Sequence, residues 1–470
     1  MSTTEKQKGN RTVWDKKGTS YDLKSKIGEG GQGLVCTTQY PNVLVKVSLH
    51  PTNDERTIDW FKHITWISRQ PLEGLHIARP QALIVKPRLG YVMELMDGLE
   101  SLRLMMQTSL DGLREGGAIQ PYLDTGGVQR RIRLLAKLAR SLAAIHGKAL
   151  AYGDLSPANI FVSKDINFSE AWLIDCDNLS VLSRDASRKV YTPDYGAPEI
   201  LRGETGINSL TDSWSFAVIA FQLLTTVHPF KGDLVENGPP ELENDALIGN
   251  LPWIDHPSDE RNQTSNGLPR EKVLTKRLRE CFERCFNVGL NQPDERPTMA
   301  EWAEALEAAC MLLAKCEIAD GCGHTFIFNP QRKCPFCGHT QPEKRSVLLR
   351  HFVFAPKSDL GEDATDKDQW LRTNELQLVD WGNSVEIRSS PVGSSTYFES
   401  PIVLKLKLVK DGLLIEPTSS VAIAFHREPN KKPQAVTRKM VVEDSWRKGL
   451  TCAIHIGEMS KLHTAWRFTW

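Results

Sequence analysis

The sequence lacks the features of an exported, membrane-spanning or disulfide-bonded chain. Its longest strongly apolar stretch, Phe216 to Leu224, has only nine residues and includes Gln222, so it is too short to span a bilayer. The amino terminus is polar and contains no apolar signal region. Ten cysteines among 470 residues are too sparse for a disulfide scaffold. We therefore expect a cytoplasmic chain with reduced thiols.

The sequence also lacks an excess of charge of either sign. The 58 Lys and Arg residues are balanced by 58 Asp and Glu residues. A positive electrostatic field over the whole chain, which would attract nucleic acids or anionic membranes, is therefore not expected. Hydrophobic residues make up 40% of the chain and charged residues 25%, which is typical of globular proteins and excludes extensive disorder. The length predicts about two or three domains.

A glycine-rich loop opens the first structured region. The pattern G-x-G-x-x-G-x-V is formed by Gly28, Gly30, Gly33 and Val35. Such glycines let backbone amides approach phosphates without obstruction by side chains. A dinucleotide-binding fold shares the loop but continues into a helix, whereas residues 34–40 and 43–47 are patterned as strands joined by a Pro-Asn turn. The second strand carries Lys46 between two valines, so we expect this lysine to reach a phosphate.

Two polar motifs follow a predicted helix over residues 127–146. The first contains Asp154 and Asn159, and Asp175 follows 21 residues after Asp154, behind a short apolar run. Phosphoryl transfer needs a carboxylate at the accepting hydroxyl and oxygen ligands for Mg²⁺. Asp154 fits the first need, and Asn159 and Asp175 fit the second. An Asx turn and an ordinary strand-end aspartate would explain either motif alone, but they explain both together poorly.

From about residue 20 to residue 315, the chain resembles a protein kinase. The segment from Asp154 to Asn159 is similar to the kinase catalytic loop, and Asp-Cys-Asp at residues 175–177 stands in the place of D-F-G. The remaining matches are the gatekeeper Met93, the hinge residues Glu94, Leu95 and Met96, the A-P-E segment Ala197, Pro198 and Glu199, the central-helix Asp212 and the late Arg296. The resemblance implies that Asp212 tethers the catalytic-loop backbone and that Arg296 pairs with Glu199.

The resemblance implies an α+β fold whose kinase-like domain is bilobal, with an N-lobe over residues 20–96 and a C-lobe over residues 97–315. Residues 1–19 are expected to form a polar tail.

ATP and Mg²⁺ are the implied cofactors, and Ser or Thr hydroxyls of a protein are the implied acceptors. The implied catalytic residues are Lys46, Asp154, Asn159 and Asp175, with Asn159 and Asp175 as Mg²⁺ ligands. The implied nucleotide contacts are Gly28, Gly30, Gly33, Val35, Lys46, Glu94, Met96, Asn159 and Asp175. Aminoglycoside kinases share the catalytic loop, but they lack the A-P-E segment and the Asp-x-Trp-Ser helix.

The chain departs from the kinase pattern at four positions. Tyr152 and Gly153 replace His and Arg, Ser156 replaces a lysine, and Asp177 replaces the glycine of D-F-G. The arginine that reads activation-loop phosphorylation is therefore absent, so activity need not depend on that modification. The departures support a second hypothesis, a nucleotide-binding pseudokinase scaffold that recruits partners.

A helix predicted to begin after Thr52-Asn53-Asp54 should supply an acid that pairs with Lys46. Glu55 and Asp59 lie one turn apart on the same face of this helix, and the sequence does not choose between them. The candidate autophosphorylation sites are Ser180, Ser183, Ser187 and Thr192.

Four cysteines cluster after the kinase-like region. Cys316, Cys322, Cys334 and Cys337 fall in two pairs, and Cys-Gly recurs in both. Tetrahedral Zn²⁺ takes four thiolate or imidazole ligands, so we expect a structural zinc ribbon over residues 316–340, with about one zinc per chain. His324 is an alternative to Cys316, and a redox pair at residues 334 and 337 is an alternative to the metal site.

The region after residue 345 is predicted to be an all-β, sandwich-like domain over residues 345–470. Residues 402–409 alternate between apolar and polar side chains, and Asp411-Gly412 is typical of a hairpin turn. A basic stretch near residues 427–439 is read as a solvated hairpin, so nucleic-acid binding is not expected.

The order of kinase, zinc ribbon and β-rich tail resembles bacterial kinases associated with tellurium-resistance von Willebrand A proteins and PPM-type phosphatases. That resemblance implies a signalling or stress-response module with such proteins as partners.

Overall fold

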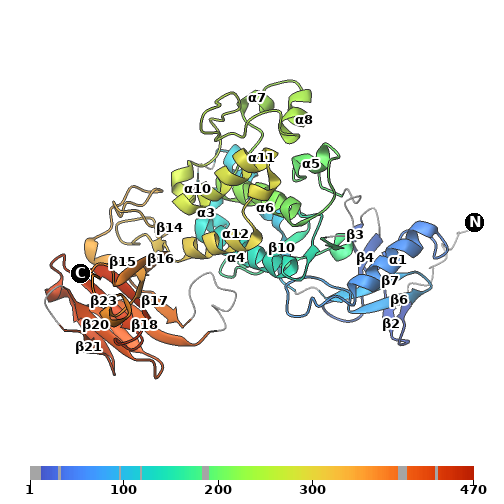
Figure 1. Ribbon diagram of the computed structural model, residues 1–470. Coiled ribbons are helices and arrows are strands. Elements are labelled where there is room, and N and C mark those ends of the chain that lie inside the picture. The colour runs from blue at the N-terminus through green and yellow to red at the C-terminus, as the bar shows by residue number, and fades with distance from the viewer. Residues whose placement is uncertain are drawn as a thin grey trace, which may run out of the picture.

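The protein was analysed as a computed structural model that describes residues 12–29, 33–94, 97–116, 119–182, 190–389, 400–428 and 432–470. A small sheet-rich lobe lies at one end of the molecule, a helical lobe lies in the middle, and a β-rich region lies at the other end (Figure 1). None of the helices in these ranges combines the length and hydrophobicity that a bilayer crossing requires.

The amino-terminal lobe is built on one seven-stranded sheet with the order β2-β1-β6-β7-β5-β4-β3. Its strands are β1 (Thr12–Asp15), β2 (Ser20–Asp22), β3 (Lys26–Glu29), β4 (Gly33–Thr37), β5 (Val43–Ser48), β6 (Ala82–Lys86) and β7 (Gly90–Glu94). The predicted strands around the glycine loop are therefore present. The expectation that residues 1–19 form a tail is wrong from residue 12 onward, because β1 pairs with both β2 and β6 and buries Val13. A four-residue strand gives too short a pattern to be recognised without its partners.

Helix α1 (Glu55–Ile67) begins where the sequence predicts it. Asp54 is its N-cap and accepts a hydrogen bond of 3.2 Å from the backbone N–H of Thr57. Trp60 and Ile64 are buried in the same hydrophobic cluster as Tyr91 of β7. Helix α1 therefore packs on the sheet face that also carries the candidate site.

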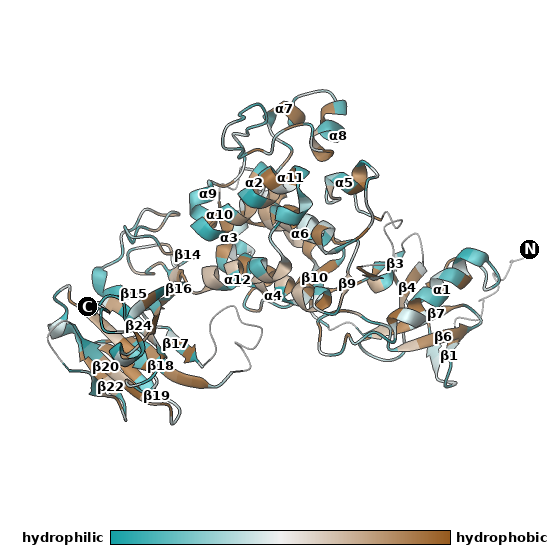
Figure 2. Cartoon of the chain, viewed as in Figure 1, coloured by the Kyte–Doolittle hydropathy of each residue, from teal (hydrophilic) through white to brown (hydrophobic). Residues whose placement is uncertain are grey.

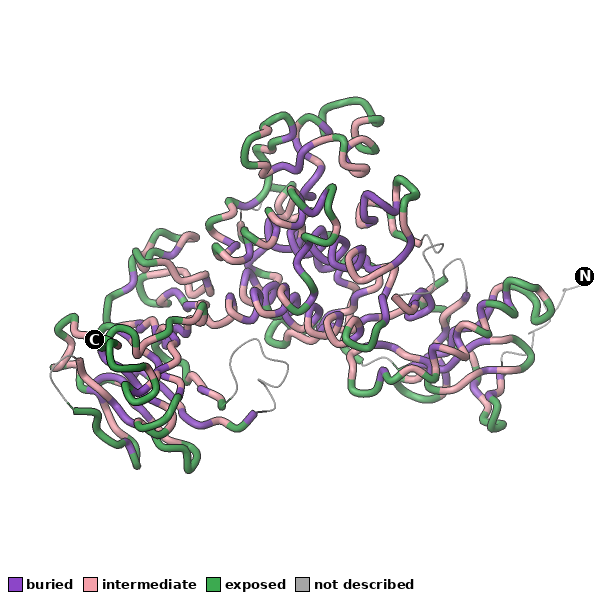
Figure 3. Tube along the Cα trace, in the orientation of Figure 1, coloured by how far each residue is buried: buried purple, intermediate pink, exposed green. Residues whose placement is uncertain are grey.

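The helical lobe surrounds two long helices. Helix α4 (Gly127–His146) has the predicted bounds, and α6 (Ser209–Thr225) is buried on almost every side, as its uniformly apolar sequence indicates (Figure 3). The other helices are α2 (Leu102–Arg114), α3 (Gln120–Asp124), α5 (Pro198–Leu201), α7 (Asp233–Glu236), α8 (Glu241–Leu247), α9 (Arg270–Val273), α10 (Lys276–Glu283), α11 (Gly289–Asn291) and α12 (Met299–Cys310). The short strands are β8 (Leu99–Ser101), β9 (Leu150–Ala151), β10 (Ile160–Ser163), β11 (Ala171–Leu173) and β12 (Ser180–Val181).

Two polar segments rich in Gly, Pro, Asn and Asp, a composition that predicts loops, contain helices. Residues 98–127 include α2 and α3, and residues 231–268 include α7 and α8. Leu or Met occupies six of the thirteen positions of α2; Leu102, Met105 and Met106 form a narrow buried stripe, and Ser101 caps the helix. The fold supplies the apolar surface that this stripe covers, whereas the polar and glycine residues of the surrounding segment favoured a loop.

The amphipathic pattern of residues 302–315 predicts one helix, but helix α12 ends at Cys310. Residues beyond it form β13 (Leu313–Lys315), which pairs with β14 (Thr325–Ile327) and opens the cysteine-containing segment. Helix propensity alone does not stop the helix here, because the stop depends on pairing with a strand ten residues later.

The carboxy-terminal region contains two antiparallel sheets, with the orders β16-β15-β24-β23-β20-β21 and β17-β18-β19-β22. The first contains β15 (Ser346–Phe354), β16 (Trp370–Asp380), β20 (Ile423–Arg427), β21 (Gln434–Ala435), β23 (Thr451–Ile456) and β24 (His463–Thr469). The second contains β17 (Ser384–Arg388), β18 (Ile402–Val409), β19 (Gly412–Pro417) and β22 (Met440–Glu443). Buried side chains of both sheets form one hydrophobic cluster. Strands β18 and β19 are among the most hydrophobic strands of this region (Figure 2).

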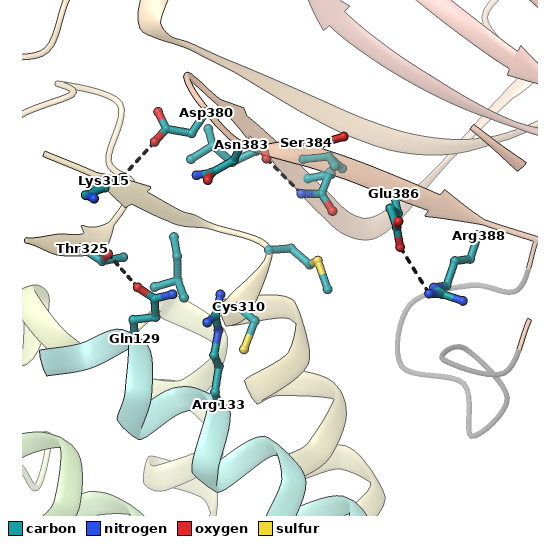
Figure 4. A pocket seen from close by; sticks show the side chains of 15 residues that line it. Gln129, Arg133, Cys310, Lys315, Thr325, Asp380, Asn383, Ser384, Glu386 and Arg388 are labelled. Atoms are coloured by element: carbon teal, nitrogen blue, oxygen red, sulfur yellow. Dashed lines mark hydrogen bonds and ion pairs between the residues drawn. The ribbon is translucent and has the colours of Figure 1, made fainter. Parts of the chain in front are cut away.

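The cysteine-containing segment joins the helical lobe to the β-rich region (Figure 4). A hydrogen bond of 2.7 Å links the Thr325 hydroxyl to the Gln129 amide of α4, and the backbone N–H of Lys315 donates a 2.9 Å bond to Asp380 of β16. A cavity of about 630 Å³ lies at this junction, between α4, the end of α12, β13 and the β16–β17 hairpin. It shares no lining residue with the candidate site below.

Candidate active site between the lobes

A cleft of about 570 Å³ lies between the sheet of the amino-terminal lobe and the helical lobe. Five of the predicted site residues line it, namely Gly28, Val35, Lys46, Asn159 and Asp175. The predicted gatekeeper Met93 lines it as well. Sequence positions 28 to 175 thus converge on one concave space, as the kinase resemblance implies.

Three predicted nucleotide contacts stand apart from this group. Gly30 and Met96 lie outside the described residues. Glu94, at the end of β7, is described but is not among the residues that line the cleft.

Gly33 is also absent from the lining, yet the fold requires a glycine there. A Cβ at this position would lie 2.8 Å from the Val47 carbonyl oxygen and 3.1 Å from the Lys46 side chain. The close approach of β4 to β5 therefore excludes any larger residue.

Lys46 faces the cleft because strand geometry alternates its side chains. Val45 and Val47 are buried in a separate cluster on the opposite face of the sheet. The Lys46 ammonium is almost fully buried, and Nζ lies 2.8 Å from Asp175 Oδ1 and 2.8 Å from Asp177 Oδ2. Burial lowers the pKa of Lys46, but the two carboxylates outweigh it and raise the pKa above its ordinary value. Lys46 is therefore a fixed cation at the back of the cleft.

Neither candidate helix acid pairs with Lys46, so the expectation of a pair with Glu55 or Asp59 is wrong. Asp59 is exposed and pairs with Lys62 at 2.8 Å, and Glu55 is also exposed. Helix α1 instead contacts a partner of Lys46, because the indole Nε1 of Trp60 donates a 2.9 Å hydrogen bond to Asp177. The prediction relied on the charge of Glu55 and Asp59, but both side chains are exposed. The side chain of α1 that is buried beside Asp177 is that of Trp60.

Asp177 is the functional candidate that sequence reasoning missed. It lies in a 3₁₀ turn, η1 (Cys176–Asn178), directly after Asp175. The acid in the place of the D-F-G glycine was treated as a defect of the motif. An aspartate two residues after the predicted metal ligand Asp175, combined with a tryptophan on the helix, was the available sign of a second ionic partner for Lys46.

Asp175 has an unusual backbone and a perturbed carboxyl group. Its φ of 59° lies in the left-handed region, where non-glycine residues are uncommon and often functional. Burial and the charge of Asp177 raise the pKa of Asp175, and Lys46 only partly offsets them. Its side chain is 34% exposed and lines the cleft, so its oxygens remain accessible to a ligand.

The catalytic-loop residues are held together by short hydrogen bonds. Asn159 Nδ2 donates to the Asp154 carbonyl oxygen at 2.9 Å and to Asp154 Oδ2 at 3.3 Å. The Thr192 hydroxyl donates to Asp154 Oδ1 at 2.7 Å. Asp154 is not among the residues that line the cleft, but it contacts the lining residue Asn159 and has an aliphatic hydroxyl at its carboxylate.

Asp212 of α6 tethers the loop, as the resemblance implies. Its Oδ2 accepts from the Tyr152 N–H at 2.7 Å and its Oδ1 from the Gly153 N–H at 2.9 Å. Tyr152 is fully buried, and its hydroxyl donates to the Ile174 carbonyl oxygen, which ties the loop to the residue before Asp175.

Glycine in place of arginine at position 153 has a local cause. Gly153 has a φ of 96°, and a Cβ there would lie 2.8 Å from the Ile207 side chain and 3.0 Å from the Asn178 carbonyl oxygen. The backbone conformation of this loop thus excludes the arginine of the usual motif.

Glu199 and Arg296 pair as the resemblance implies. The Arg296 Nη1 and Nη2 atoms lie 2.7 and 2.8 Å from the two Glu199 carboxylate oxygens, and both side chains are buried. Such bidentate pairs combine charge with fixed geometry. This pair anchors the A-P-E segment, residues 197–199, to the base of the helical lobe.

The four predicted cysteine ligands lie together. Their Sγ atoms all fall within 4.8 Å of one another, and the Cys316–Cys337 and Cys322–Cys334 distances are both 3.7 Å. Zn–S bonds of about 2.3 Å in a tetrahedron require S–S edges of about 3.8 Å, so the donor set fits zinc. His324 does not belong to this cluster, and its carbonyl oxygen accepts from the Cys316 N–H instead. The geometry therefore favours Cys316 over His324 as the fourth ligand.

Comparison with known proteins agrees with this geometry. The model of the family described as "Protein kinase domain" matches residues 21–306, more than half of the chain. Pkn2, a serine/threonine-protein kinase of Myxococcus xanthus, is 33% identical over 132 residues, which are 26% of this chain and 16% of pkn2. Myosin light chain kinase A of Dictyostelium discoideum is 29% identical over 237 residues, 49% of this chain and 73% of that kinase. Pkn1, another serine/threonine-protein kinase of Myxococcus xanthus, is 26% identical over 224 residues, 46% of this chain and 30% of Pkn1.

The chain thus spans less than a third of the two Myxococcus kinases and about three quarters of the Dictyostelium kinase. The matched range contains the cleft, the catalytic loop and the Glu199–Arg296 pair. Because the family model covers most of the two lobes, the chain belongs to the protein kinase family.

Proposed function

We propose that this protein is an ATP- and Mg²⁺-dependent kinase that transfers the γ-phosphate of ATP to Ser or Thr hydroxyls of proteins. The observation that carries the proposal is the convergence of Lys46, Asn159 and Asp175 on one cleft, with the Asp154 carboxylate 3.3 Å from Asn159 Nδ2. Phosphoryl transfer depends on positioning and charge stabilisation, and these residues supply both.

Each side chain has a distinct role in this proposal. Lys46 places a buried cation against the phosphates, and Asn159 and Asp175 offer the amide and carboxylate oxygens that would hold Mg²⁺. Bound Mg²⁺ would neutralise the charge that develops on the phosphate oxygens. Asp154 orients the accepting hydroxyl and takes up its proton, a role worth roughly 10²–10⁴ in rate.

The hydroxyl of Thr192 supports an aliphatic acceptor. It already occupies a hydrogen-bonding position 2.7 Å from Asp154 Oδ1. Among the candidate autophosphorylation sites, Ser180 is buried, and Ser183 and Ser187 lie outside the described residues. Thr192 is therefore the candidate that the geometry favours.

One observation favours the alternative, a nucleotide-binding pseudokinase scaffold. Ser156 replaces the catalytic-loop lysine, is buried, and has a hydroxyl without a hydrogen-bond partner among the described residues. It cannot supply the cation that kinases usually place on the transferred phosphate. Lys46 and Mg²⁺ would then have to carry the whole phosphate charge.

The full-length protein, incubated with radiolabelled ATP, Mg²⁺ and a generic protein substrate, separates the two functions. We expect label on protein from the wild type and at least a hundredfold less from Asp154→Asn, with nucleotide affinity unchanged. Nucleotide binding without transfer to the protein itself, to a generic substrate or to candidate partners would establish the scaffold instead.

We further propose that the four-cysteine cluster is a structural zinc ribbon and that the two carboxy-terminal sheets form a sandwich that recruits partners. Four protein thiolates leave no open position for substrate, which favours a structural site over a catalytic one. The subfamily resemblance adds a cytoplasmic bacterial signalling module, with a PPM-type phosphatase and a von Willebrand A-domain protein as partners. Co-purification of such proteins with the tagged chain tests that part.

A further inference from the structure

We propose that Asp177 is the positioning carboxylate of Lys46, that it takes the role left empty on helix α1, and that it is not a metal ligand. This inference rests on the proposed kinase function. It divides the work of the two neighbouring aspartates: Asp175 faces the nucleotide and its metal, and Asp177 holds the lysine.

Both carboxylate oxygens of Asp177 are already occupied by protein donors. Oδ1 accepts from the Tyr91 hydroxyl at 2.7 Å, and Oδ2 accepts from Trp60 Nε1 at 2.9 Å and from Lys46 Nζ at 2.8 Å. The side chain is only 1% exposed. A buried charge needs this degree of compensation, and the three donors leave little room for a cation.

Asp175 contrasts with Asp177 in each of these respects. Its side chain is 34% exposed, and it lines the cleft, whereas Asp177 does not. It shares Lys46 with Asp177, at the same distance of 2.8 Å. When Asp175 turns to a metal, Asp177 keeps Lys46 neutralised and in place.

Helix α1 contributes a neutral hydrogen bond in place of a charge. Trp60 is buried between the helix and the sheet, and its indole N–H ends on the Asp177 carboxylate. The carboxylates paired with Lys46 therefore come from the segment that follows β11, and α1 contributes the Trp60 N–H group to Asp177. A movement of α1 would change the hydrogen bond that holds Asp177 against Lys46.

The removal of Asp177 should therefore damage two functions together. Lys46 would keep only Asp175 as a carboxylate partner, so the lysine would compete with Mg²⁺ for the Asp175 oxygens. In Asp177→Asn we expect kcat/KM for ATP to fall at least tenfold and the Mg²⁺ concentration for half-maximal rate to rise at least threefold. A merely structural role would lower the amount of active enzyme without moving the Mg²⁺ dependence.

The matched control is Asp59→Asn, which removes an exposed acid from α1 and should leave both quantities within twofold of the wild type. A transplant tests equivalence directly: Trp60→Glu combined with Asp177→Gly moves the acid to the helix, and it should be more active than Asp177→Gly alone. If Asp177→Asn does not fold, Tyr91→Phe and Trp60→Phe, which each remove one donor, should each raise KM for ATP about threefold.

The role of Asp177 can be measured even without phosphoryl transfer. If the wild type transfers no phosphate, affinity for a fluorescent ATP analogue in Mg²⁺ still tests Asp177, with Lys46→Ala as the reference for complete loss of the lysine. Weakening in Asp177→Asn comparable to Lys46→Ala supports the assignment. Unchanged ATP affinity and Mg²⁺ dependence in folded Asp177→Asn overturns it.

Discussion

The hydroxyl of Thr192 donates a hydrogen bond of 2.7 Å to Oδ1 of Asp154, 38 residues earlier in the chain. This contact docks the segment before the A-P-E motif onto the catalytic loop. It also leaves Oδ2 of Asp154 to Asn159. The carboxylate is therefore oriented from two sides before any substrate binds.

Loss of the Thr192 hydroxyl should lower the rate of phosphoryl transfer without weakening nucleotide binding. We expect Thr192→Ala to reduce kcat by about 10- to 100-fold, because a misoriented carboxylate loses part of its catalytic contribution. Thr192→Ser keeps the hydroxyl and should retain most of the activity. Initial rates at saturating ATP measure the effect, and equal rates for Thr192→Ala and the wild type would contradict the orienting role.

The buried pair of Glu199 and Arg296 should be a major determinant of stability. Glu199→Gln leaves the Arg296 guanidinium buried without its counter-ion, and the removal of one partner of a buried pair costs about 3–5 kcal/mol. The measurement is urea unfolding followed by tryptophan fluorescence. Glu204→Gln, which removes the exposed partner of Arg202, is the control and should leave the transition almost unchanged.

Zinc should be bound stoichiometrically at the cysteine cluster. We expect elemental analysis to find about one zinc per chain, and Cys334→Ser to lose most of it, because the thiolate is the ligand. The β13–β14 pairing should then open, which would show as faster proteolysis between residues 313 and 345. Cys281→Ser, outside the cluster, is the control. If wild-type protein produced with ample zinc contains none, the zinc ribbon is disproved.

The stability of the helical lobe should fall in mild acid through His228. The backbone N–H of Phe230 donates to His228 Nδ1 at 3.1 Å, and Nε2 lies 3.0 Å from the Asp194 carbonyl oxygen, so the folded imidazole is neutral with its proton on Nε2. Burial, the largest cause, lowers the pKa of His228 to about 4, well below the 6.5 of an exposed histidine.

The unfolded chain therefore binds a proton below about pH 6.5 that the folded chain does not bind until about pH 4. The free energy of unfolding should decrease as the pH falls through this window, by up to about 1.4 kcal/mol per pH unit for this one group. Urea unfolding at pH 6.5, 5.5 and 4.5 measures the slope. His228→Gln should be less stable at pH 6.5 but should show a smaller slope, and an equal slope would exclude His228 as the cause.

Much of the site could be predicted from the sequence because its motifs are short and local. The glycine loop, Lys46 in its strand, and the spacing of Asp154, Asn159 and Asp175 lie within continuous segments whose pattern carries the chemistry. The cysteine pairs are local in the same sense. The start of α1 and the bounds of α4 were also predictable, because Asp54 caps α1 and the apolar periodicity runs through α4.

The errors arose where partners are distant along the chain. Strand β1 exists because β6, about 70 residues later, offers an edge, and β13 ends a helix because β14 pairs with it. Strands β15 and β16 were not foreseen at all, although they form the most extensive antiparallel pair of the first carboxy-terminal sheet. Short strands derive their stability from cross-strand contacts that a local pattern does not contain.

The sequence by itself determined which functional groups are present, namely a glycine-rich loop, a lysine in a strand, the carboxylate and amide oxygens of two short motifs and two pairs of cysteines, because each depends on residue types at short spacing. Only the tertiary structure decided which acid holds Lys46. Glu55 and Asp59 carry the expected charge but remain in water, whereas Asp177 is enclosed with Lys46, Tyr91 and Trp60. A buried ion pair forms where burial and donors coincide, and that coincidence is a property of the folded chain.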